Sequence, residues 1–296
     1  MRIRSLLAAG VAALALAVAG PAAAQVAPAD QPAQPETAPG AFTIEFDTFK
    51  KANRRAGSIL RRSGAMQAIA DEVNSRWSIP REIPVVFGDD LEIGPAFIPD
   101  LKLEDGTVLN FINMPGTFIR LELQEFRREI RREKIKGLKP KQALIYATEF
   151  VLAHEMGHAL VHELKLPITG KEEDAVDGFA AYLLADNPKF GPMTAISAAM
   201  FFDLYTRIRG KLTQEDFADE HSLLEQRVYQ FLCWVYGSDP KRFKGLVGKD
   251  LLPRERARRC PNEWKQVTSS WDTLLKPYEK AAPQTPATEP TQAPAA

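Results

Sequence analysis

The amino-acid sequence predicts an α+β domain that is mainly α and contains a small antiparallel sheet. Apolar residues recur at helical spacing through most of the chain after Pro115. Short segments before Pro115 are rich in β-branched and aromatic residues and are separated by Gly, Asp and Pro. Polar, Pro-rich segments lie at both ends, which leaves about 240 residues, enough for one hydrophobic core.

The N-terminus has the pattern of a secretory signal peptide. Arg2 and Arg4 precede an apolar run, and small residues end at Ala24, so we expect cleavage after Ala24 and a periplasmic or secreted protein. An uncleaved anchor is the alternative, but the run is short and rich in Ala, which disfavours stable membrane insertion. Loss of residues 1–24 leaves 36 basic and 38 acidic residues, a net charge of −2 that does not favour nucleic acid as a partner.

The composition also divides the remaining chain. Residues 25–40 and 281–296 consist mainly of Pro, Ala, Gln, Thr and acidic residues, so we expect a disordered linker and a disordered tail. Residues 41–280 then form the folded domain. No internal repeat is visible in it.

The first part of the domain is expected to build the sheet. Ala56–Trp77 has a helical pattern that Pro80 ends, and the segments around it alternate or are continuously apolar. Turn residues separate these segments, which favours short antiparallel strands. The expected strands are Phe42–Phe49, Ile83–Phe87, Gly94–Pro99 and Thr107–Met114.

Helices are expected to form the rest of the domain. Ile119 begins a helical pattern whose outer face pairs Glu with Arg or Lys three residues on, as in Glu125 and Arg128. The basic stretch Arg127–Lys141 is therefore interpreted as a solvated face with paired charges, not as a nucleic-acid or membrane patch. The later helices are expected at residues 143–162, 171–185, 193–208 and 222–236.

The helix at 143–162 contains the sequence His154-Glu155-Met156-Gly157-His158, an H-E-x-x-H motif. Residues four apart lie on one helix face about 6 Å apart along the axis, so His154 and His158 can bind one ion. Glu155 is then placed to act as general base on the attacking water. The alternative is a set of hydrogen-bonded core polar groups, but the apolar flanks predict a buried helix whose polar residues need partners.

A catalytic zinc needs a third protein ligand. The metzincin continuation is absent, because Val161 and Leu164 stand where it would require Gly and His. Periodicity alone allows either Glu172 or Glu173 to face inward. The run from Glu173 to Asp177 resembles the E-x-x-x-D element of the gluzincins, and this resemblance implies that Glu173 is the third ligand and that Asp177 orients a ligand histidine. The gap of 15 residues between His158 and Glu173 is shorter than in thermolysin-like members.

Two further histidines need an interpretation. In gluzincins a downstream histidine often stabilises the tetrahedral oxyanion, so the resemblance makes His221 a catalytic candidate, with Arg227 as a second choice. The alternative is that residues 219–222 form a polar cap of the next helix. His162 lies about 12 Å along the axis from His154, too far to share the ion, and is expected at the rim or in the core.

A closer resemblance covers most of the mature chain. It rests on residues 149–158 and 170–177, and especially on residues 218–227 and 233–240. These segments are similar to a bacterial family of metallopeptidases known as domain of unknown function 4344. The resemblance implies a zincin-like fold and secretion, and it leaves the substrate open.

The chain contains only two cysteines, Cys233 and Cys260, and no C-x-x-C pair. In an oxidising compartment they are expected to form one disulfide, which would close a loop of 27 residues. The chain-entropy model assigns such a loop about 3–4 kcal/mol of stabilisation. Two buried free thiols are the alternative.

Together these features predict a secreted metallopeptidase with one Zn²⁺ per chain and a peptide or protein substrate. The cleft is expected between the edge of the sheet and the H-E-x-x-H helix, where a substrate would bind as an added strand. The alternative function is a zinc-bound envelope protein that binds a partner, or acts like a chaperone, without hydrolysis. Glu155 argues against it, because a binding-only site needs no general base.

Overall fold

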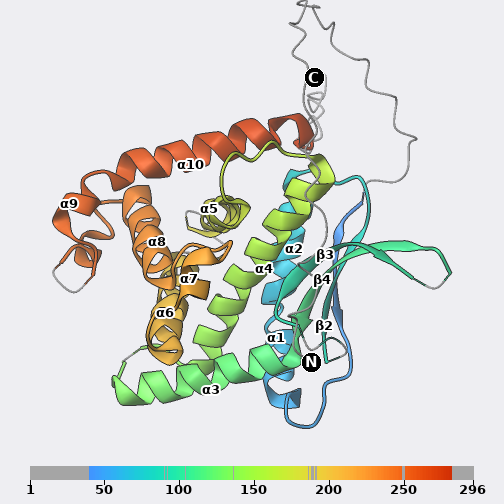
Figure 1. Cartoon of the computed structure of the whole chain (residues 1–296), viewed down its shortest axis with the longest axis horizontal. Helices are drawn as coiled ribbons and strands as arrows, with labels where there is room; N and C mark the ends of the chain where they lie inside the picture. Colours follow the sequence, from blue (N-terminus) through green and yellow to red (C-terminus); the bar gives the residue numbers. More distant parts are fainter. Residues whose placement is uncertain are drawn as a thin grey trace, which may run out of the picture. The chain divides into compact units, whose positions relative to one another are not determined.

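The computed structural model describes residues 40–281, apart from residues 90, 92, 104, 136, 186, 188, 189, 191, 249 and 250. The described residues are mainly helical and include one four-stranded sheet (Figure 1). The elements in chain order are β1 (Phe42–Phe46), α1 (Arg54–Ser63), α2 (Ala65–Arg76), β2 (Ile83–Gly88), β3 (Ala96–Lys102), β4 (Val108–Pro115), α3 (Gly116–Arg132), α4 (Pro140–Leu164), α5 (Glu172–Leu184), α6 (Pro192–Arg209), α7 (Gln214–Ala218), α8 (Leu224–Ser238), η1 (Lys244–Leu246), α9 (Arg254–Ala257), α10 (Cys260–Leu275) and η2 (Lys276–Tyr278). This composition confirms the predicted α+β class.

The sheet is mixed, so the prediction of an antiparallel sheet is wrong. The strand order is β1-β2-β4-β3, in which β1 pairs with β2 and β2 with β4 in parallel, and only β3 pairs with β4 in the antiparallel sense. The reason is the connection between the first two strands. Helices α1 and α2 carry the chain back across the sheet, and such a crossover places the next strand parallel to the previous one.

Two boundaries also differ from the sequence prediction. The single helix expected at Ala56–Trp77 is divided at Gly64, which has a φ of +69° and adopts the left-handed conformation that ends α1 and precedes α2. The strand expected at Gly94–Pro99 begins later and continues to Lys102, because it pairs with β4 on both sides of a bulge.

Helix α4 is the longest described helix and carries the H-E-x-x-H motif. It packs against α3, α5 and α6, and also contacts β3, so it lies between the helices and the sheet (Figure 1). Its buried residues occupy every side of the helix from Thr148 to Gly157, as predicted from the apolar flanks of the motif.

Gly157 allows α5 to approach α4 closely at the motif. A Cβ atom at Gly157 would lie 2.9 Å from the Cβ atom of Val176 and 3.2 Å from Cδ1 of Phe179, both on α5. A larger residue would push the two helices apart. The motif glycine therefore sets the distance at which the acidic start of α5 faces the two histidines.

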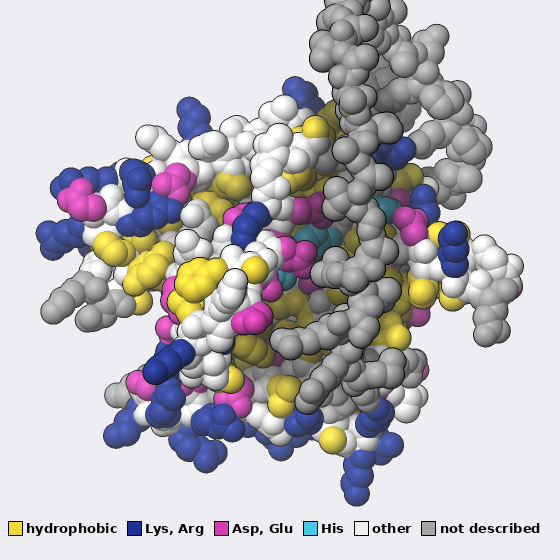
Figure 2. Space-filling model, viewed as in Figure 1, with side chains coloured by type: hydrophobic (Ala, Val, Ile, Leu, Met, Phe, Trp, Pro, Cys, Tyr) yellow, Lys and Arg dark blue, Asp and Glu magenta, His cyan; other side chains and the backbone are white. Residues whose placement is uncertain are grey.

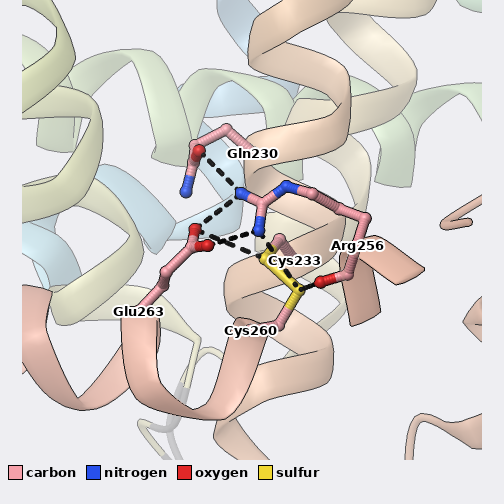
Figure 3. Close-up of a disulfide and its surroundings, with 5 residues drawn as sticks. All are labelled: Gln230, Cys233, Arg256, Cys260 and Glu263. Atoms are coloured by element: carbon pink, nitrogen blue, oxygen red, sulfur yellow. Dashed lines mark hydrogen bonds and ion pairs between the residues drawn. A yellow bond between two sulfur atoms is a disulfide. The ribbon is translucent and has the colours of Figure 1, made fainter. Parts of the chain in front are cut away.

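The predicted disulfide between Cys233 and Cys260 is present and joins α8 to α10 (Figure 3). Both cysteines are fully buried. Beside them, the guanidinium of Arg256 donates two hydrogen bonds of 2.6 Å to the carboxylate of Glu263 and one of 3.1 Å to Gln230. The cross-link and this ion pair hold α10 against the helices that carry the rest of the core.

The terminal predictions fall outside the described residues. The signal peptide at 1–24, nearly all of the linker at 25–40 and nearly all of the tail at 281–296 are not described. Among the residues that are described, no helix combines the length and the apolar character needed to cross a membrane. The paired charges predicted on α3 are found between Glu125 and Arg128, and between Glu129 and Arg132.

Candidate metal centre

The two motif histidines point their Nε2 atoms at each other from successive turns of α4. These atoms lie 3.3 Å apart. The Nδ1 atom of His154 lies 2.9 Å from Asp177, and the Nδ1 atom of His158 lies 2.8 Å from Glu172. Because an ionised carboxylate only accepts hydrogen bonds, each Nδ1 carries a proton, and Nε2 of each ring is the nitrogen left to bind an ion once it has released any proton of its own.

Glu173 brings an oxygen donor to that point. Its Oε2 lies 3.1 Å from Nε2 of His154, and its Oε1 lies 3.3 Å from Nε2 of His158. One ligand atom from each of the three side chains falls within 4.8 Å of the others. Two imidazole nitrogens and one carboxylate oxygen fit the ligand set of a mononuclear zinc site. Asp177 and Glu172 orient the two imidazoles through their Nδ1 atoms, as is usual for histidine ligands.

The structure separates the two adjacent acids that the sequence leaves as alternatives. Glu173 faces the pair of Nε2 atoms, whereas Glu172 contacts the opposite ring nitrogen of His158. The side chain of Glu172 is 47% exposed and that of Glu173 is 14% exposed. Glu172 is therefore placed to orient His158, a role that the sequence did not predict.

Asp177 is held by Arg227 as well as by His154. Nε and Nη2 of Arg227 each donate a hydrogen bond of 2.7 Å to the Asp177 carboxylate. Burial acts to raise the pKa of Asp177, but the charge of Arg227 and the contact with His154 outweigh burial and lower that pKa. The guanidinium of Arg227 thus contacts Asp177 on the Nδ1 side of His154, away from Nε2. Arg227 is therefore poorly placed for the oxyanion role that was its alternative from the sequence.

The cluster is electrostatically coupled. Burial acts to lower the pKa of His154, but Asp177 and Glu173 outweigh it and raise that pKa to about 9. Burial acts to raise the pKa of Glu173, but hydrogen bonds from His154, His158 and His221 hold it far below its usual range. Glu173 is therefore ionised across the ordinary pH range, as an oxygen ligand must be.

Glu155 lies between α4 and the sheet. Its Oε2 accepts a hydrogen bond of 2.8 Å from the main-chain N–H of Phe97 on β3. A cavity of about 610 Å³ opens at this position. It is lined by Pro95, Ala96, Phe97, Pro99, His154, Glu155, His158, Val161, His162, Lys171, Glu172, Glu173, Glu220 and His221. The predicted position of the cleft, between the sheet edge and the motif helix, agrees with this cavity.

His221 reaches the same cluster from the segment between α7 and α8. Its Nε2 lies 2.9 Å from Oε2 of Glu173, and its Nδ1 lies 2.9 Å from Asp219. The ammonium of Lys171 donates to the main-chain oxygens of Asp219 and His221, at 3.1 and 3.0 Å, and holds this segment over the start of α5.

His162 lies on the rim of the cavity, where its exposed ring is 3.7 Å from Asp100. In Figure 2 histidine side chains are surrounded by acidic side chains near the middle of the face shown. Sequence reasoning missed the roles of Lys171, Asp219 and the Phe97 main chain. Only Asp219 left a signal, as an acid two residues before a histidine.

The α4–α5 pair, with its histidines, its glutamates and the cavity beside them, has the features of a mononuclear metal-dependent hydrolase site. The comparison with protein families agrees with this class. The model of the family DUF4344, described as "Putative metallopeptidase", matches residues 47–275, so the chain belongs to this family. No curated protein and no solved structure matches the chain significantly.

Proposed function

We propose that this protein is a zinc-dependent metallopeptidase. The observation that carries the proposal is the convergence of Nε2 of His154, Nε2 of His158 and the Glu173 carboxylate beside a cavity into which Glu155 projects. Membership of a family described as metallopeptidases supports a peptide bond as the target. A zincin-like fold for residues 41–280 is part of the same proposal.

His154, His158 and Glu173 would hold the ion. When bound, zinc would polarise the scissile carbonyl and make the attacking water more acidic. Glu155 takes the proton from this water and returns it to the nitrogen of the leaving group. Asp177 and Glu172 keep the two Nδ1 atoms protonated, and Arg227 keeps Asp177 ionised and in place.

His221 is proposed to stabilise the oxyanion that develops on the scissile carbonyl. Its support is position, because Nε2 lies against Glu173 at the border of the cavity while Nδ1 is held by Asp219. A ring fixed in this way would donate its Nε2 hydrogen to the oxyanion at little entropic cost, in place of the contact that Nε2 makes with Glu173 in the structure. The expectation that residues 219–222 simply cap α8 has less support, since the N-cap of α8 is Leu223 and the side chains of His221 and Ser222 contact Asp219 and Asp174 instead.

The decisive experiment is Glu155→Gln, which preserves the size of the side chain but removes its basicity. The zinc content of the purified protein should not change, and cleavage of a broad peptide library should fall by about 10²–10⁴-fold, the usual contribution of a general base. Glu45→Gln is the matched control, because Glu45 is exposed on β1, at the opposite edge of the sheet from β3. A parent protein that cleaves nothing, or a Glu155→Gln variant as active as the parent, would favour the non-hydrolytic binding protein.

Export is proposed as well. The support is the signal-peptide pattern of residues 1–24, together with a buried disulfide, which is compatible with an oxidising compartment. The mature N-terminus should be Gln25, and N-terminal sequencing of material from the periplasm or the medium tests this. Retention of Met1 in that material would contradict it.

A further inference from the structure

Strand β3 borders the cavity and forms one edge of the sheet, since β4 lies on its other side. Figure 1 shows β3 and β4 as a long hairpin beside α4. A free strand edge normally offers N–H and C=O groups from every second residue, and a bound peptide can pair with this row as an added strand. Whether β3 can do so depends on which of its amides face the cavity.

Only Phe97 supplies an amide N–H to the cavity between residues 95 and 100, all of which the structure describes. Pro95 and Pro99 have no amide hydrogen. Ala96 and Ile98 alternate with Phe97, so their N–H groups face β4, where they pair with Asn113 and Phe111. The N–H of Phe97 points the other way and reaches Glu155 at 2.8 Å.

Beyond Pro99 the edge is no longer regular. The register with β4 shifts between Ile98 and Leu101, and Asp100 in this bulge has a φ of +51°. The N–H of Asp100 is used inside the hairpin, where it donates to Oδ1 of Asn110 at 2.7 Å. A bulge and prolines are features that prevent a sheet edge from accepting a further strand.

We propose that the main chain of Phe97 is the single amide anchor for a peptide on β3, so that the protein selects substrate segments held at one residue and not long extended strands. This inference rests on the proposed peptidase function and narrows its substrate class. The substrate carbonyl that accepts the Phe97 N–H takes the place of the Glu155 carboxylate. Binding at the anchor thereby frees Glu155 to receive a proton from water.

The test is a backbone ester scan. Zinc-loaded Glu155→Gln protein is titrated with an unmodified peptide library, and the tightest peptide is remade with one amide at a time replaced by an ester, which weakens the carbonyl as an acceptor. One ester position should weaken binding by about 2–10-fold, the net effect of a single hydrogen bond. Losses at every second position, or a library in which no peptide binds, would overturn the proposal.

The prolines provide a gain-of-function arm. Pro99→Ala should create a second sensitive ester position two residues from the first, and Pro95→Ala should create one on the other side. Pro167→Ala is the matched control, because Pro167 is exposed and lines a different cavity. A scan that keeps one sensitive position in both cleft variants would show that the prolines do not limit pairing, and would overturn the proposal.

Cleavage of the same peptides by the parent protein separates this inference from the proposed function. One sensitive position without cleavage would retain the anchor and refute hydrolysis. Cleavage combined with alternating sensitivity would retain hydrolysis and refute the anchor.

Discussion

Removal of either of the two adjacent glutamates, Glu172 and Glu173, should weaken zinc binding to very different extents. Glu173 is the only carboxylate among the described residues that contacts both ring nitrogens facing the site, at 3.1 and 3.3 Å. The free energy of zinc binding at structural sites with four ligands is about 10–16 kcal/mol, so one ligand accounts for about 2.5–4 kcal/mol of it. Glu173→Ala should therefore weaken zinc binding by on the order of 10²–10³-fold.

Glu172→Ala should have a smaller effect. Loss of a group that orients a ligand histidine typically costs about 10–100-fold in affinity, and the exposure of Glu172 to water, 47% of its side chain, favours the lower end. Water can replace it at Nδ1 of His158. Among the described residues no other carboxylate contacts both Nε2 atoms, so water is the replacement for Glu173 as long as α5 keeps its position.

The assay is competition for zinc against a chromophoric chelator at fixed pH and ionic strength. Glu220→Ala is the control for the loss of one negative charge, since Glu220 has a carboxylate oxygen within 4.8 Å of Glu173 and His221 but lies outside the group of His154, His158 and Glu173. Its affinity should change only a few-fold, as expected for a screened charge. Equal losses for the two adjacent glutamates, or a larger loss for Glu172, would show that the assigned ligand is wrong.

Three further predictions follow from separate parts of the structure. His221→Ala should lower kcat by about 10²–10³-fold at unchanged zinc content, and a loss of folding in circular dichroism would instead favour a capping role. Replacing Cys233 and Cys260 by Ser should lower the free energy of unfolding by about 3–4 kcal/mol in denaturant titrations, and no change would contradict the cross-link. Burial raises the pKa of Glu149 to about 7, although a hydrogen bond from Thr194 acts to lower it. The folded state therefore binds the proton more tightly than the unfolded state, and the free energy of unfolding decreases as the pH rises from about 4.5 to 7. The difference in the free energy of unfolding between Glu149→Gln and the parent should therefore be up to about 3 kcal/mol more favourable to the variant at pH 8 than at pH 4. Denaturant titrations that give the same difference at both pH values would refute this.

Local geometry made the motif helix predictable. The spacing of His154 and His158 fixes their common face as soon as the segment is helical, and the apolar flanks show that the face is buried. The order of the strands was not predictable in this way. It depends on which strands meet after α1 and α2 have crossed the sheet. In the chain β3 lies between β2 and β4, but in the sheet β4 pairs with β2 and β3 takes the outer edge.

The third ligand shows the same limit at a smaller scale. Adjacent residues at the start of a helix differ by about 100° in direction, so periodicity cannot decide which of Glu172 and Glu173 meets the histidines until the position of α5 is known. That position depends on Gly157, where only a glycine permits contact with Val176. The resemblance to the gluzincins pointed to Glu173, and the packing of the two helices supplies the physical reason.

The first turn of α5 gathers three consecutive acids, Glu172, Glu173 and Asp174, which would repel one another if they shared one environment. They diverge instead to three partners. Glu172 contacts Nδ1 of His158, Glu173 contacts the Nε2 atoms, and Asp174 accepts a hydrogen bond of 2.8 Å from Ser222, next to His221. The positive end of the helix dipole further favours acids at this end of α5. One helical turn thus fixes a proposed ligand, the orientation of a second ligand and the segment that carries the proposed oxyanion donor, so a shift of α5 by even one residue would separate all three at once.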